Sequence, residues 1–303
     1  IVFGDWSSDV CSSDLRLRGR QTVQVAVGAG ESLTFSIRCH KVGRYDNPAE
    51  WTLADAAGTV LQSGVVPMGE AADISLADAK PGVYALTIDA KLNAYSVRSP
   101  LRNLSYTASG SFPLKIIYQV PRLHFWVPVG AREIRATVRG QGVEQAACSI
   151  RAADGRMVAT GNSQEQDGKI TVAVPPETAG QAWSIELSEL PGFTFEDVSL
   201  VLDGDLVPVV AEDPARLLLP MLTAFAQPVP GGAEFGLRLN VAAGELAGKR
   251  LEFLVREVGE GTILVERTLD TPSGRISTVV EREGLIHAEI VGQIGRASCR
   301  ERV

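Results

Sequence analysis

The sequence predicts an all-β protein made of three tandem antiparallel β-sandwiches, immunoglobulin-like or jelly-roll-like, with the third truncated. Three observations predict this fold class. Apolar and polar residues alternate in many segments along the chain, and a pair of turn glycines recurs at an interval the length of a domain. Gly and Pro are also frequent, at 30 and 16 of 303 residues. Glycine and proline favour the turns that join short strands.

The alternation has a period of two, which places one side of a strand in a core and the other side in water. The apolar members are mainly Val, Ile, Leu and aromatic residues, which suit a half-buried pleated surface. One stretch could be helical, LLLPMLTA, but Pro220 interrupts it, and we expect a linker strand there. The alternating segments, in chain order, are SLTFSIRC, YALTIDA, EIRATVRG, KITVAV, WSIELSEL, FGLRLNV and RLEFLVREV.

The same unit occurs three times along the chain. In each unit an alternating strand meets a turn rich in Asp, Gly or Glu, a second strand follows, and two more strands flank another glycine-containing turn. An interval of about a hundred residues is typical of a sandwich domain and too long for a solenoid repeat. The turn glycines are Gly58, Gly155 and Gly259, which are 97 and 104 positions apart, and Gly82, Gly180 and Gly284, which are 98 and 104 apart.

These repeats predict domain boundaries. The first sandwich covers residues 16–108, the second 109–217 and the third 218–292. We expect the polar segment TASGS to form a hinge between the first two. The third unit lacks a final strand on this count, so we expect it to have an unpaired edge and the lowest stability of the three.

Both ends of the chain resemble translated sequencing adapters. IGRASCRERV, in residues 293–303, matches a reading frame of a common short-read adapter, and DWSSDVCSSDL, in residues 1–15, matches a frame of its partner. Both are polar and lack apolar periodicity, so burial could not offset their ordering entropy and we expect them to be unstructured. Residues 16–292 would then be an internal part of a longer protein, which would explain the missing initiator Met and signal segment.

The composition excludes some classes of partner. A formal net charge of −7 argues against a nucleic-acid surface, which needs clustered Lys and Arg. No stretch approaches the roughly 18 apolar residues of a membrane-spanning helix. Apart from two cysteines in the end segments, Cys39 and Cys148 lie in apolar alternating contexts. We expect both to be buried thiols, and a disulfide between them would have to cross a domain boundary.

Paired carboxylates are the candidates for catalysis, because sugar cleavage uses two of them around one bond. Glu196 with Asp197, and Asp203 with Asp205, are close in sequence, but VSLVLDGDL is typical of a strand and turn with its acids in water. We therefore predict no catalytic residue. The three histidines fall one in each unit, and no loop offers the five or six oxygens of a calcium cage, so we predict neither a metal site nor a cofactor.

Aromatic side chains in loops are the candidates for ligand binding, because flat sugar faces stack on exposed rings while nearby polar groups bind the hydroxyls. Trp51, Trp183 and Tyr84 are expected to pack in the core instead, since they occupy alternating strand positions or follow a turn glycine. The predicted ligand-binding residues all belong to the first unit: Tyr45, Asp46 and Asn47 in a loop, assisted by Asn93 and Tyr95.

Several segments resemble known modules. ADAAGTVLQSG and KPGVYALTIDA resemble pre-peptidase-type and immunoglobulin-like sandwich modules of exported bacterial proteins. FWVPVGAREIRATVRG and RAADGRMVATG are similar to a module of large multidomain bacterial proteins, many of glycoside hydrolase type, and LRLNVAAGELAGKRLEFLVRE resembles an immunoglobulin-like or macroglobulin-like sandwich. The resemblance implies extracytoplasmic accessory modules and transfers no catalytic residue.

Three functions follow as hypotheses. The first is a non-catalytic spacer or accessory unit, with polysaccharide and the rest of the parent polypeptide as partners. The second is part of a polysaccharide-acting enzyme, which would require two carboxylates about 5 to 10 Å apart in a cleft. The third is an adhesin-like array, which would require an exposed apolar patch of several hundred Å².

Overall fold

The structure is a computed structural model, and the prediction of an all-β protein is confirmed. The described residues form 23 strands and two short 3-10 turns, without an α-helix among them. The described part of the chain also contains no helix of the length and apolarity needed to cross a lipid bilayer. The described residues are 15–28, 30–100, 104–118, 120–214, 217–218, 222–230, 232–239, 251–257, 263–269, 275–280, 285–292 and 295–302.

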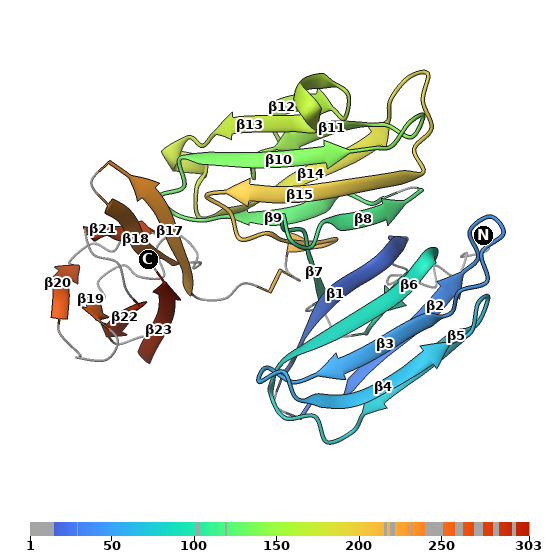
Figure 1. Cartoon of the computed structure of the whole chain (residues 1–303), viewed down its shortest axis with the longest axis horizontal. Helices are drawn as coiled ribbons and strands as arrows, with labels where there is room; N and C mark the ends of the chain where they lie inside the picture. Colours follow the sequence, from blue (N-terminus) through green and yellow to red (C-terminus); the bar gives the residue numbers. More distant parts are fainter. Residues whose placement is uncertain are drawn as a thin grey trace, which may run out of the picture.

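Six strands form the part of the molecule that we call the first lobe (Figure 1). Strand β6 joins its two layers, because β6 pairs with β1 and β3 on one side of the fold and with β2 on the other. β4 and β5 pair only with β3 and β2, respectively, within the described residues. The strands are β1 (Leu17–Val27), β2 (Leu33–His40), β3 (Ala49–Ala54), β4 (Val60–Val66), β5 (Ala71–Leu76) and β6 (Gly82–Arg98).

The turns of this lobe follow from local sequence. In the β3–β4 turn, the backbone N–H groups of Ala57 and Thr59 both donate to Asp55 Oδ1 at 2.9 Å, and Gly58 has a φ of +82°. Glycine adopts this left-handed conformation without the steric cost that a Cβ imposes. The Asp and Gly of the predicted first turn thus close the hairpin as expected.

Nine strands form the second lobe, and β7 (Leu104–Thr107) connects it to the first. Two runs of strands, β12-β11-β14-β9-β16 and β8-β15-β10-β13, enclose a core that contains the fully buried Phe125 and Trp183. The strands are β8 (Leu114–Ile117), β9 (Leu123–Val127), β10 (Glu133–Arg139), β11 (Ala146–Arg151), β12 (Met157–Asn162), β13 (Lys169–Ala173), β14 (Gln181–Glu189), β15 (Asp197–Gly204) and β16 (Val209–Ala211), with 3-10 turns at Glu165–Gly168 and Pro176–Thr178.

The two lobes share their hydrogen bonding and their core. Strand β1 pairs with β6 of its own lobe and also with β7 and β8, and β7 pairs in turn with β16. A single cluster of buried apolar residues extends from Leu15 to Val210. The domain boundary predicted at residue 108 therefore lies inside continuous structure.

The segment TASGS differs from the predicted hinge for a structural reason. Ala108 is fully buried, and its N–H donates to the carbonyl of Pro208 at 2.9 Å. Its own carbonyl accepts from the N–H of Leu202 at 2.7 Å. Both partners belong to the second lobe, so Ala108 is fixed to that lobe directly after β7 and cannot serve as a flexible joint.

The third predicted unit forms two small sheets, β17-β18-β21 and β20-β19-β22-β23. Pro220 lies outside the described residues, and β17 begins two residues after it. The strands are β17 (Leu222–Val229), β18 (Gly232–Leu239), β19 (Leu251–Glu257), β20 (Ile263–Leu269), β21 (Arg275–Val280), β22 (Leu285–Gly292) and β23 (Gly295–Arg302).

The structure corrects the expectation that both ends are unstructured. Strand β23 falls within residues 293–303 and pairs with β22 along its whole length, from Gly292 opposite Gly295 to Leu285 opposite Arg302. Edge pairing satisfies the backbone and does not require apolar side chains. At the other end Leu15 is buried in the core, and residues 1–14 lie outside the described residues.

Candidate functional site

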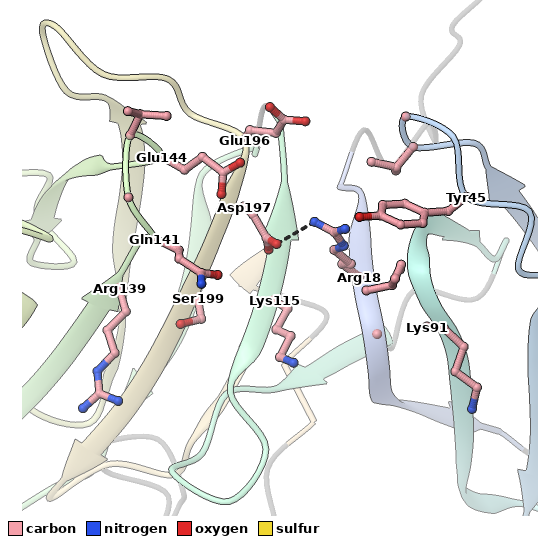
Figure 2. A pocket seen from close by; sticks show the side chains of 17 residues that line it. Arg18, Tyr45, Lys91, Lys115, Arg139, Gln141, Glu144, Glu196, Asp197 and Ser199 are labelled. Carbon is pink, nitrogen blue, oxygen red and sulfur yellow. Dashed lines mark hydrogen bonds and ion pairs between the residues drawn. The ribbon is translucent and has the colours of Figure 1, made fainter.

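A cleft of about 930 Å³ lies where the two lobes meet (Figure 2). Two irregularities shape its first-lobe side. Gly19, at a bulge in β1, has a φ of +66°, and Lys91, in the middle of β6, has a φ of +54°. The pairing of β1 with β6 shifts register between these residues, and Arg18, Gly19 and Lys91 all line the cleft.

Tyr45 is the one predicted ligand-binding residue that lines this cleft. Its side chain is 37% exposed, and the guanidinium carbon of Arg18 lies 6.0 Å from the centroid of its ring, within the range of a cation–π contact. Asp46 is exposed beside Lys41, at 3.5 Å, and does not line the cleft. Asn47 contributes its backbone carbonyl to the anchoring of the loop.

Asn93 and Tyr95 have structural roles, which corrects the prediction that they assist in ligand binding. Asn93 is fully buried; its Oδ1 accepts from the N–H of Val42 at 3.0 Å, and its Nδ2 donates to the carbonyl of Asn47 at 2.6 Å. Tyr95 is also fully buried, and burial raises the pKa of its hydroxyl well above the ordinary value. Alternation does not hold in this part of β6, where five consecutive residues, 93–97, are buried.

Three carboxylates also line the cleft: Glu144, and the adjacent pair Glu196 and Asp197, about 50 positions further along the chain. Asp197 Oδ2 forms an ion pair with Arg18 Nη1 at 2.6 Å, across the junction of the lobes. Desolvation by burial raises the pKa of Glu144, and the negative charges of Asp197 and Glu196 raise it further. Glu196 and Asp197 were expected to lie in water away from any site, and the structure instead brings both to the cleft.

Glu144 was missed in the sequence because only the fold gives it partners. It follows β10 in a turn in which its N–H donates to the carbonyl of Gln141 at 3.0 Å. Gly140 begins this turn, and the backbone of Glu144 comes so close to it that a Cβ at position 140 would lie 1.8 Å from the Glu144 carbonyl oxygen. The available sequence signal was therefore the pair Gly140 and Gly142. This pair indicates a tight turn, but it does not indicate that the turn borders a cleft.

The second predicted acid pair lies elsewhere. Asp203 forms an ion pair with Arg135 at 3.1 Å, and Asp205 is buried and accepts from the N–H of Arg132 at 2.9 Å. The latter contact holds the start of β10 to the end of β15. Within the described residues there is also no group of three or more His, Cys, Asp or Glu side chains that could hold a metal ion.

The predicted core aromatic residues are confirmed for Trp183 and Tyr84. Trp183 is fully buried and its Nε1 donates to the carbonyl of Thr178 at 3.0 Å, and the Tyr84 hydroxyl donates to the carbonyl of Lys80 at 2.8 Å. Trp51 is half-buried and packs on the core next to Gly64.

Cys39 and Cys148 are buried free thiols, and burial raises the pKa of Cys148 to about 12.

Comparison with known proteins adds little. No family model matches the chain, and no curated protein matches its sequence. Among solved structures, it is similar to a biofilm-associated protein BSP domain, at 9% identity over 97% of this chain and 65% of that one, with a TM-score of 0.24. It is also similar to an FMN-binding β-glucuronidase from Facaelibacterium prausnitzii L2-6, at 13% identity over 89% of this chain and 39% of that one, with a TM-score of 0.25.

A third similar structure is the β-glucuronidase of Ruminococcus gnavus, at 8% identity over 92% of this chain and 46% of that one, with a TM-score of 0.21. The chain thus spans less than two thirds of the length of each of these proteins. At such TM-scores the similarity carries no argument about function. The structure itself defines the class: an all-β chain with two lobes joined by shared strands and a polar cleft at their junction.

Proposed function

We propose that this chain is a non-catalytic accessory part of a larger extracytoplasmic bacterial protein, of tandem β-sandwich type. In this proposal the two lobes act as one rigid spacer, and the cleft at their junction binds carbohydrate. The extracytoplasmic setting rests on the module resemblance alone. The shared strand β1 supports the rigid spacer, because an arrangement hydrogen-bonded through β1, β7 and β16 resists bending between its halves.

The observation that carries carbohydrate binding is the half-exposed ring of Tyr45 in a cleft with hydrogen-bonding side chains around it. Figure 2 shows the Tyr45 hydroxyl directed toward Arg18 and the opposite wall, where Gln141 and Ser199 lie. A sugar uses this combination, since its C–H groups stack on a ring while its hydroxyls take hydrogen bonds from the surrounding polar groups.

Substitution of Tyr45 tests the proposal. Tyr45→Ala is expected to weaken retention on a bound polysaccharide by up to about tenfold, the loss of one aromatic contact. Affinity electrophoresis through gels that contain soluble polysaccharides of different composition measures this retention.

Tyr118 offers a matched control. It is 39% exposed, carries the guanidinium of Arg16 at 5.9 Å from its ring, and lies outside the cleft lining. Tyr118→Ala should leave retention unchanged. Equal loss in both variants would contradict binding in the cleft, and an absence of retention of the parent chain on every polysaccharide would reduce the role to that of a spacer.

A second candidate, a polysaccharide-cleaving site, is favoured by one observation. Glu144 has a raised pKa and shares the cleft with Asp197, and a pair of carboxylates in different environments is one of the requirements of glycoside hydrolysis. In this candidate the protonated Glu144 would serve as general acid toward a leaving oxygen, while an ionised carboxylate serves as base or nucleophile.

Reducing-sugar release from polysaccharides tests this candidate. Because the acid must be protonated, activity is expected to fall as the pH rises through the raised pKa of Glu144. Glu144→Gln is expected to lower the rate by about 10² to 10⁴, the usual effect of removing a general acid. Glu165→Gln, an exposed control outside the cleft, should keep full activity. Parent chain that releases no sugar at any pH would contradict the candidate and leave the accessory role.

A further inference from the structure

A row of three polar side chains crosses the second-lobe wall of the cleft. Ser199 in β15 is the direct partner of Lys115 in β8 and of Arg139 in β10. Direct partners in neighbouring strands point to the same face of a sheet. Because neighbouring strands lie about 4.8 Å apart, the Cα atoms of Lys115 and Arg139 are about 10 Å apart with Ser199 between them. All three residues line the cleft.

The two cations of this row lack a carboxylate partner in the described part of the chain, in contrast to the other cations of the cleft. Arg18 is paired with Asp197 at 2.6 Å, and Lys91 with Asp89 at 2.7 Å. No ion pair within 4.0 Å involves Lys115 or Arg139 among the described residues. Two uncompensated positive charges on either side of a hydroxyl are suited to one anionic group.

The side chain of Lys115 reaches toward the first lobe. Its side chain lies along Gly19 of β1, where an added Cβ would be 3.7 Å from Lys115 Cδ and 3.8 Å from Nζ. The ammonium group of Lys115 therefore lies beside the bulge in β1, next to the first-lobe wall of the cleft.

The acids occupy a different part of the lining. Asp197 is two residues from Ser199 on the same face of β15, which displaces it by about 6.6 Å along the strand. In Figure 2 the labelled Glu144 and Glu196 lie with Asp197 at one end, and the charged ends of Lys115 and Arg139 lie at the other. The cleft is thus polarised along its length.

We propose that the carbohydrate bound in this cleft is acidic, with a carboxylate or sulfate group held by Lys115, Ser199 and Arg139. This inference rests on the carbohydrate binding proposed above and names the ligand class. The Arg139 guanidinium donates two parallel hydrogen bonds to such an anion, the Lys115 ammonium supplies a second charge, and the Ser199 hydroxyl donates between them. Neighbouring sugar units of the ligand extend toward Tyr45, which lines the same cleft.

Matched pairs of polymers test this inference on the full chain. Polygalacturonate is compared with its methyl ester, which lacks the carboxylate charge, and dextran sulfate with dextran. We expect the chain to be retained on at least one charged polymer about tenfold more strongly than on its neutral counterpart. This retention should weaken as salt is added. The two pairs distinguish a carboxylate ligand from a sulfate ligand.

Charge-removing variants locate the contact. Lys115→Gln with Arg139→Gln is expected to weaken retention on the charged polymer by about tenfold or more, since each charge-assisted hydrogen bond contributes substantially. The control, Lys169→Gln with Arg38→Gln, removes two charges from exposed strand positions outside the cleft and should leave retention unchanged.

The outcomes separate the two proposals. Equal retention on charged and neutral polymers, unaffected by the Lys115 and Arg139 substitutions, would overturn the acidic ligand and leave carbohydrate binding intact. The acidic ligand would also be overturned if the Lys115 and Arg139 substitutions and the control substitutions weakened retention equally, because the effect would then come from net charge. Absence of retention on all four polymers would overturn the acidic ligand, whereas carbohydrate binding itself fails only if the chain is retained on none of the polysaccharides of the electrophoresis test above.

Discussion

Replacing Tyr106 with Ala is expected to lower the free energy of unfolding by about 3 kcal/mol, and to destabilise both lobes together. Tyr106 is 2% exposed and lies in β7, where it is opposite Val23 of β1 and Val210 of β16. Loss of its ring leaves a cavity at the position where the lobes share strands. Because one core runs through both lobes, we expect one cooperative transition rather than two.

Hydrogen exchange followed by mass spectrometry measures this effect segment by segment. Protection should fall together in β2–β5 and in β11–β14, far from the substitution on either side. Phe112→Ala provides the control, since Phe112 belongs to the same connection but is 53% exposed, and its loss should change little. Increased exchange confined to a single lobe would show that the lobes unfold independently.

Replacing Gly140 with Ala is expected to have the second large effect, a loss of about 3 kcal/mol of stability together with loss of polysaccharide retention. A Cβ at this position would lie 1.8 Å from the Glu144 carbonyl oxygen, a backbone atom that cannot rotate away. The turn that carries Gln141 and Glu144 into the cleft must therefore move. Thermal denaturation and affinity electrophoresis on the same variant measure the two effects.

Gly142 is the matched control two residues away. It has a φ of +61°, but an added Cβ would meet nothing within 4 Å. Gly142→Ala should therefore cost only about 1 kcal/mol of backbone strain and leave the cleft able to bind. If the two variants behave alike, the close approach at Gly140 does not shape the cleft.

The shared strands matter for function because they determine where the cleft is. Arg18 and Asp197 are separated by 179 positions in the sequence, yet they form an ion pair across the junction. A mobile hinge at TASGS would separate Tyr45 from the row of Lys115, Ser199 and Arg139 whenever it opened. Continuous pairing through β1 and β7 keeps both walls at a constant distance, so a ligand that spans them pays no cost for bringing the lobes together.

Most of the cleft could not be predicted from the sequence, because its walls come from strands that are far apart along the chain. Tyr45 was identified because it stands in a polar loop, a local property. Asn93 was misassigned because its two hydrogen bonds reach a loop about 50 residues away. Lys115 and Arg139 are isolated cations in alternating strands and carry no local signal of a site, and only the register of β8, β15 and β10 makes them neighbours.

The sequence by itself determined the all-β class, the strand segments and the turns, because alternation and turn residues act over a few positions. Asp55 with Gly58 closes its hairpin as predicted, and Trp183 enters the core as its strand position indicated. Only the tertiary structure decided that β1 joins two lobes and that a charged cleft forms between them. Strand pairing between distant segments depends on which edges meet, and backbone hydrogen bonds that link such edges leave no signature in side-chain pattern.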